Sequence, residues 1–224
     1  MKKLNLIIFP GTGSPYNKLY KDVYALLSSG ANKYGYGKIE NTITYPGHIR
    51  IDGTTEGELT LDGAIETAIS KVYYYENNGI NYDFLGRSFG SFVTVKIAIG
   101  RKLNNLQRLI LWGPPPYWLV WQMFVRDLEE NRRIAKTKGV YVEETFFRSI
   151  IPLESMLSSL EYPTIIASGT KDAYSKPGYI EYLKSLFEYR NNISFRMVDD
   201  APHEVTIQNC TDATIGAYLE ALFG

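Results

Sequence analysis

The pentapeptide Gly-Arg-Ser-Phe-Gly at residues 86–90 decides the fold predicted for this chain. A largely apolar run precedes it at residues 80–85 and another follows at 91–99, which is the pattern of a buried strand that turns into a buried helix. A serine flanked by glycines at such a turn is typical of a nucleophile elbow, since only glycine-sized neighbours avoid a clash beside so strained a serine. The turn places the Ser88 hydroxyl at the carboxyl edge of a parallel sheet and the Phe89 N–H at a helix N-terminus, where it can donate to an oxyanion. Because this short pattern also arises by chance, the rest of the chain must supply the context.

Two further polar side chains follow strand-like runs later in the chain. Residues 164–168 lead into Gly-Thr-Lys-Asp, which ends at Asp172, and residues 193–198 lead into Asp-Asp-Ala-Pro-His, which ends at His203. The chain order Ser88, Asp172, His203 is that of the α/β-hydrolase arrangement and differs from the chymotrypsin and subtilisin orders. Over nearly its whole length the sequence therefore resembles the α/β-hydrolase superfamily. The resemblance implies that Ser88 is the nucleophile, His203 the general base and Asp172 the acid that orients the base.

Other residues compete for these three catalytic roles. A serine needs a neutral imidazole to accept its proton, and the chain has one histidine besides His203. That residue, His48, follows Tyr-Pro-Gly after a strand-like run, where the superfamily often carries a histidine that shapes the pocket, so we expect a structural role for it. Asp199 and Asp200 are alternative orienting acids, although a solvated loop is the simpler explanation for both. Ser14 is the alternative nucleophile, because it lies in another glycine-rich turn.

The amino terminus supplies a candidate for the second oxyanion donor. Residues 4–9 form a short apolar run that ends in Pro-Gly-Thr-Gly-Ser at residues 10–14, the pattern of a buried strand followed by a glycine-rich loop. The loop resembles the superfamily's His-Gly-x-Gly loop, with Pro10 where many members have histidine, and this implies that the Thr12 N–H joins that of Phe89 in the oxyanion hole. A dinucleotide site would need a third glycine where Tyr16 stands, and a phosphate loop would need a Gly-Lys-Ser/Thr ending. A plain strand-to-helix turn remains the alternative.

The composition indicates one enzyme-sized domain, residues 1–224, without a highly charged partner. The 224 residues include 24 Lys and Arg and 24 Asp and Glu, a balance that argues against a nucleic-acid or anionic-membrane surface. The single cysteine, Cys210, excludes an intramolecular disulfide and a cysteine-based zinc site. The apolar stretch after residues 1–3 is broken by Pro-Gly at 10–11, too early for a secretory signal, and no run approaches the roughly 18 apolar residues of a membrane helix. We therefore expect a cytoplasmic chain without a membrane span, whose oligomeric state the sequence leaves open.

Strand and helix patterns alternate along the chain, which predicts an α/β fold with a doubly wound, mostly parallel six-stranded sheet. The expected strands fall near residues 4–9, 38–44, 80–85, 106–112, 163–168 and 193–198. The expected helices fall near residues 16–29, 61–77, 89–102, 177–189 and 211–222.

The segment at residues 114–160 interrupts this alternation. It spans about fifty residues, too many for a structureless connection in a compact domain, and the superfamily carries a helical cap over the active site at this point. We therefore expect a small helical cap inserted before the penultimate strand. Trp118, Trp121 and Phe124 stand in a dense apolar block, where aromatic side chains serve equally well to line a substrate pocket or to pack the cap onto the core. Residues 127–138 form a charge run typical of a solvated helix face.

Together these features favour a cofactor-independent serine hydrolase that holds no metal ion and acts on a small acyl substrate. A carboxylic ester with an apolar acyl group is the first choice, because an uncharged, aromatic-rich cap offers little to hold a charged chain end. A peptidase or amidase and a thioesterase use the same triad and remain alternatives. A non-catalytic binding protein of the same fold is the alternative of another class, and the complete set of Ser88, Asp172 and His203 counts against it.

Overall fold

Six parallel strands form one sheet in the computed structural model, which describes residues 3–41, 43–119, 122 and 128–224. The strand order is β2-β1-β3-β4-β5-β6, so the chain starts one strand in from an edge, adds β2 on the outer side of β1, and then builds the rest of the sheet on the other side of β1. The strands are β1 (Asn5–Phe9), β2 (Ile39–Glu40), β3 (Tyr82–Arg87), β4 (Leu106–Trp112), β5 (Thr164–Gly169) and β6 (Ile193–Val198). The predicted fold class is confirmed.

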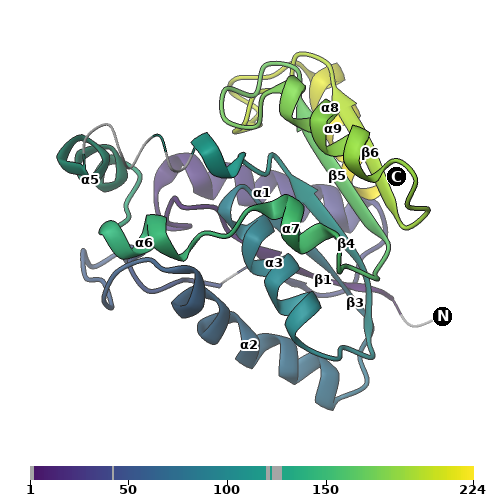
Figure 1. Cartoon of the computed structure of the whole chain (residues 1–224), viewed down its shortest axis with the longest axis horizontal. Helices are drawn as coiled ribbons and strands as arrows, with labels where there is room; N and C mark the ends of the chain where they lie inside the picture. The colour runs from purple at the N-terminus through teal and green to yellow at the C-terminus, as the bar shows by residue number, and fades with distance from the viewer. Residues whose placement is uncertain (1–2, 42, 120–121, 123–127) are drawn as a thin grey trace.

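Helices cover both faces of the sheet (Figure 1). On one face, α1 (Lys18–Lys33) and α9 (Asp212–Phe223) bury their apolar side chains in a common core. On the other face lie α2 (Leu61–Asn77), α3 (Phe89–Gly100) and α8 (Pro177–Phe187). The side chains of β1 alternate between the two cores, with Leu6 and Ile8 in the first and Ile7 and Phe9 in the second. A central strand that is buried on both sides needs the continuous apolar run that the sequence shows there.

Strand β2 is much shorter than the predicted strand at residues 38–44. Only Ile39 and Glu40 pair with β1, at the edge of the sheet. Beyond them the side chains of Ile43 and Tyr45 are both buried in the core on the α2 side. In a strand, side chains two residues apart point to the same face, so burial of Ile43 and Tyr45 gives the alternating pattern that is typical of a strand. Here the two side chains pack into the core without pairing in the sheet.

The segment between β4 and β5, residues 114–160, is called the inserted segment below. In its described part it carries α5 (Leu128–Thr137), α6 (Glu144–Ser149) and α7 (Leu153–Leu157). A short two-stranded contact holds it to the loop after β2: the Ile49 N–H donates to the Gly139 carbonyl, and the Tyr141 N–H donates to that of Gly47, each over 2.7 Å. Among the described residues, no helix has the length and apolar character needed to cross a membrane.

Candidate active site

Ser88 lies between β3 and α3 in a backbone conformation that side chains rarely adopt. Its φ is 52° and its ψ is −119°, and its N–H donates to the Trp112 carbonyl of the neighbouring strand over 2.8 Å. A Cβ at Gly90 would lie 2.2 Å from the carbonyl oxygen of Phe9, so only glycine allows α3 to approach the end of β1 this closely. At Gly86 a Cβ would meet the backbone of the same helix at 2.7 Å. The two glycines therefore permit the sharp turn that holds the serine at the sheet edge.

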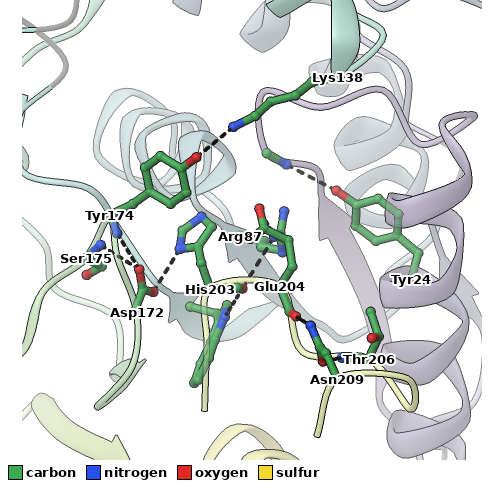
Figure 2. Close-up of polar contacts among 12 residues, drawn as sticks. Tyr24, Arg87, Lys138, Asp172, Tyr174, Ser175, His203, Glu204, Thr206 and Asn209 are labelled. Atoms are coloured by element: carbon green, nitrogen blue, oxygen red, sulfur yellow. Dashed lines mark hydrogen bonds and ion pairs between the residues drawn. The ribbon is translucent and has the colours of Figure 1, made fainter. Parts of the chain in front are cut away.

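Asp172 and His203 meet on the same edge of the sheet (Figure 2). The Oδ2 atom of Asp172 lies 2.8 Å from the Nδ1 atom of His203, and its Oδ1 atom accepts 2.8 Å hydrogen bonds from the N–H groups of Tyr174 and Ser175. Burial alone would raise the pKa of Asp172, but the hydrogen bond with His203 and those two N–H groups outweigh it, and the pKa is lowered. Asp172 is thus a carboxylate at neutral pH. It orients His203 with the Nδ1 atom as donor, which leaves Nε2 to accept a proton.

Gly113, directly after β4, lies against this pair, and sequence reasoning missed it. Its φ is +56°, and a Cβ there would be 2.8 Å from the Oδ2 atom of Asp172 and 2.9 Å from the Nδ1 atom of His203. Its N–H continues the sheet by donating to the Ala167 carbonyl over 2.8 Å. Only a residue without a side chain leaves room for the hydrogen-bonded pair, and the strand-end dipeptide Trp-Gly was the available signal.

A cavity opens at this edge, and Ser88 and His203 both line it together with Thr12. Its other lining residues are of two kinds, apolar and polar, and the two groups are called the apolar wall and the polar wall below. The apolar wall consists of Phe89, Phe92, Pro115, Leu119, Phe146, Phe147 and Ile150. The polar wall consists of Tyr20, Arg87, Lys138, Tyr174 and Glu204.

The loop after β1 borders the elbow from the other side. A Cβ at Gly11 would lie 3.2 Å from that of Ser88, and the Gly11 N–H donates to the Tyr24 hydroxyl over 3.2 Å. The N–H groups of Thr12 and Phe89 are the ones predicted to form the oxyanion hole. Both residues line the cavity, so their N–H groups are candidates for binding a substrate oxygen.

Comparison with known proteins identifies the fold of the chain. Neither a protein-family model nor a curated protein matches the chain. Among solved structures, the esterase Est1E from Butyrivibrio proteoclasticus superposes with a TM-score of 0.66 at 14% identity, covering 99% of this chain and 85% of its own. The esterase Pf2001 from Pyrococcus furiosus gives 0.64 at 18% identity, covering 100% and 82%, and an alpha-beta serine hydrolase homologue from Coxiella burnetii gives 0.59 at 16%, covering 99% and 83%. The chain has the α/β-hydrolase fold.

Within this α/β-hydrolase fold, Arg87 is a buried charge next to Ser88 that sequence reasoning did not single out. Its guanidinium lies 3.2 Å from Glu204, donates to the His203 carbonyl over 3.4 Å and stacks over the Tyr20 ring at 5.4 Å. Burial opposes the charge, but the nearby Tyr24 and Glu204 hold the pKa of Arg87 above its ordinary value. Arg87 therefore ties the loop that carries His203 to the elbow. The available signal was a charged residue between two apolar runs.

His48 is buried away from the cavity lining of the hydrolase fold. Its Nδ1 atom accepts a 3.2 Å hydrogen bond from the Tyr45 N–H. Burial lowers the pKa of His48 to about 4, and the adjoining backbone of Gly11 and Thr12 offsets only part of this effect. His48 lies between the loop after β1, which it contacts at Gly11 and Thr12, and the inserted segment, with which it forms a bridge at Val140. This position agrees with the structural role expected for it.

The structure places the alternative catalytic residues away from the cavity. Ser14 is buried, and its hydroxyl donates to the Ile49 carbonyl over 2.8 Å, so it fixes a loop. Asp199 and Asp200 are exposed, and Asp200 pairs with Lys171 at 2.8 Å. Neither aspartate is hydrogen-bonded to His203.

Of Trp118, Trp121 and Phe124, which were expected either to line a pocket or to pack the inserted segment onto the core, the structure describes Trp118. Trp118 is half-exposed and lines a shallow surface depression with Tyr179 and Tyr182, outside the cavity at Ser88. The next residue, Leu119, lines the cavity instead, because consecutive helix residues point about 100° apart. Trp121 and Phe124 lie outside the described residues.

Phe146 and Phe147 of α6, together with Phe89, form the aromatic part of the apolar wall, which is called the aromatic wall below. No three His, Cys, Asp or Glu side chains within residues 3–41, 43–119, 122 and 128–224 lie close enough together to hold a metal ion.

Proposed function

We propose that this chain is a cofactor-independent serine hydrolase that cleaves a carboxylic ester through an acyl-enzyme on Ser88. The observation that carries the proposal is the 2.8 Å contact between Asp172 and His203 beside a strained serine that lines the same cavity as His203. The α/β-hydrolase fold and its likeness to two esterases support this reading.

The proposed reaction has two halves with the same tetrahedral chemistry. The Ser88 hydroxyl attacks the ester carbonyl while the Nε2 atom of His203 takes its proton, and the N–H groups of Thr12 and Phe89 hold the oxyanion. His203 then returns the proton to the leaving alcohol oxygen, and the C–O bond of the ester breaks. Water attacks the acyl-enzyme by the same route and releases the acid and free Ser88. Asp172 remains ionised throughout and stabilises the imidazolium.

The apolar wall favours an apolar acyl group. Phe89 follows the nucleophile directly, and its ring packs at 5.3 Å on that of Phe146, which in turn packs at 5.0 Å on Phe147. An acyl chain bound against these rings removes apolar surface from water without burying an unpaired polar group.

Labelling with a fluorophosphonate, which reacts with activated serines, tests the proposal. We expect the wild-type protein to be labelled and to hydrolyse aryl esters. Ser88→Ala should lose both activities while keeping the fold, because removing one hydroxyl from the cavity lining leaves no large void in the core. Ser14→Ala is the matched control and should keep labelling per folded molecule. Full labelling and hydrolysis by Ser88→Ala would refute the proposal, and a correctly folded wild-type protein that neither reacts nor hydrolyses would favour a binding protein. Amide or thioester cleavage faster than ester cleavage would change the substrate class only.

A further inference from the structure

The polar wall of the cavity holds a lysine that no carboxylate neutralises. Lys138 follows α5 directly, and its backbone is fixed because its carbonyl accepts a 3.1 Å hydrogen bond from the Ser14 N–H. Its ammonium group lies 3.1 Å from the Tyr174 hydroxyl and 4.7 Å from the centre of the Tyr174 ring. Within the part of the chain that the structure describes, it forms no ion pair. A half-buried cation in a cavity, held only by neutral groups, attracts an anion more strongly than a solvated surface lysine does.

The second cation of this wall is already paired. Arg87 is buried and lies 3.2 Å from Glu204, so these two charges offset each other. An amine-bearing substrate would have to compete with Arg87 for that carboxylate. The polar wall is therefore better suited to a negative ligand group, and Lys138 is the residue to receive it.

The position of Tyr174 indicates which part of a substrate would carry the negative group that Lys138 receives. Its ring packs against the His203 ring at a centroid distance of 4.9 Å, and its N–H donates to Asp172 (Figure 2). In ester hydrolysis the histidine passes its proton to the leaving oxygen, so side chains on the histidine side of the cavity face the leaving group. The acyl group would instead pack against the aromatic wall.

We propose that Lys138 and Tyr174 bind a carboxylate on the leaving group, so that the substrate is an ester of a hydroxy acid with an apolar acyl group. This inference rests on the proposed function and adds the class of alcohol released. The Lys138 ammonium and the Tyr174 hydroxyl both donate to the carboxylate, and the Tyr174 ring keeps water from one side of the contact. A phosphate would call for more donors, such as an arginine cluster or a helix N-terminus, than these two residues supply.

Two esters of equal size test the proposal: 4-carboxyphenyl butanoate, an anion at neutral pH, and its neutral analogue 4-carbamoylphenyl butanoate. The readout is the ratio of their kcat/KM values, in which effects common to both esters cancel. We expect the wild-type protein to prefer the anion about tenfold, and this preference to shrink at high ionic strength. In Lys138→Met the ratio should fall to about one. Lys136→Met, which removes the same charge from exposed α5 surface outside the cavity, is the matched control and should keep the ratio.

The outcomes separate this inference from the proposed function. Hydrolysis that depends on Ser88 but shows no preference for the anion, or a preference that survives in Lys138→Met, overturns the carboxylate site and leaves the serine hydrolase standing. If neither ester is cleaved and the fluorophosphonate does not react, the proposed function fails, and calorimetric binding of 4-carboxyphenyl butanoate then decides. Binding that weakens about tenfold in Lys138→Met but not in Lys136→Met supports the site, and absence of binding overturns it.

Discussion

The sheet edge and the inserted segment build the cavity in different ways. At the sheet edge, Arg87, Asp172 and His203 are all buried, and the side chain of each has a polar partner from another part of the chain. In the inserted segment, charged side chains pair with one another on exposed α5 and α6, as Arg133 does with Glu130, while the cavity side is apolar apart from Lys138. Fixed, preorganised groups suit the chemical step, whereas apolar side chains suit discrimination between substrates. Changes at the sheet edge should therefore lower the rate for every substrate, and changes in the inserted segment should alter the order of preference.

The largest loss is expected from Asp172→Asn. The amide would present an N–H to the Nδ1 atom of His203 and favour the tautomer with Nε2 protonated, which cannot accept the Ser88 proton. We expect kcat to fall by about 10⁴ for all esters with little change in their order. Asp200→Asn, an exposed control that loses only its pair with Lys171, should retain full activity. Comparable inactivity in both variants would show that Asp172 has no special role.

Gly113→Ala tests how tightly the sheet edge holds the pair. The added methyl would lie within 3 Å of both Asp172 and His203, so the imidazole must move. We expect kcat/KM to fall by about 100-fold, since a shift of one ångström can have that effect. Gly79→Ala is the matched control, because its φ of +60° imposes the same backbone strain while nothing lies within 4 Å of the new methyl. Both variants should lose about 1 kcal/mol or more of unfolding free energy, and only Gly113→Ala should lose activity.

The fold and the three catalytic candidates were within reach of the sequence because they depend on local patterns. Each strand-like run that precedes Ser88, Asp172 or His203 is a strand of one parallel sheet, and the carboxyl ends of parallel strands share an edge. The helix predicted at residues 61–77 has those bounds. The strand predicted at 38–44 was wrong beyond Glu40, because burial of Ile43 and Tyr45 imitates a strand pattern.

The residues that sequence reasoning missed act through contacts between distant parts of the chain. Gly113 matters because of Asp172 and His203, and Arg87 because of Glu204. Lys138 lay inside a charge run that suggested a solvated face, and only the path of the inserted segment brings it over Tyr174. The local periodicity of a sequence carries no information about such long-range contacts.

In the inserted segment, Phe146→Ala should change substrate order. Its ring is buried and packs on that of Phe89, the residue after Ser88, so we expect its loss to lengthen the proposed acyl side of the cavity. We expect the kcat/KM ratio of long to short acyl esters to rise about tenfold, together with a loss of about 3–5 kcal/mol of unfolding free energy. Trp118→Ala, a half-exposed control, should leave the ratio unchanged. If the activity of Phe146→Ala merely follows the fraction unfolded, with the same acyl order, the aromatic wall only packs the core.

The smallest effect on catalysis, and a distinct one on stability, is expected at His48, where the two regions meet. Burial lowers the pKa of His48 from 6.5 in the unfolded chain to about 4 in the folded one. Below pH 6.5 His48 becomes protonated in the unfolded state, whereas in the folded state it stays neutral until about pH 4. The contribution of neutral His48 to the unfolding free energy is therefore complete above pH 6.5 and is lost between pH 6.5 and 4, by about 3 kcal/mol in all.

His48→Gln, which cannot titrate but keeps an acceptor for the Tyr45 N–H, should remove this part of the acid dependence. We expect its kcat/KM at neutral pH to remain close to that of the wild type. Urea unfolding of both proteins from pH 7.5 to 4 measures the difference, and parallel curves would mean that His48 is not held neutral.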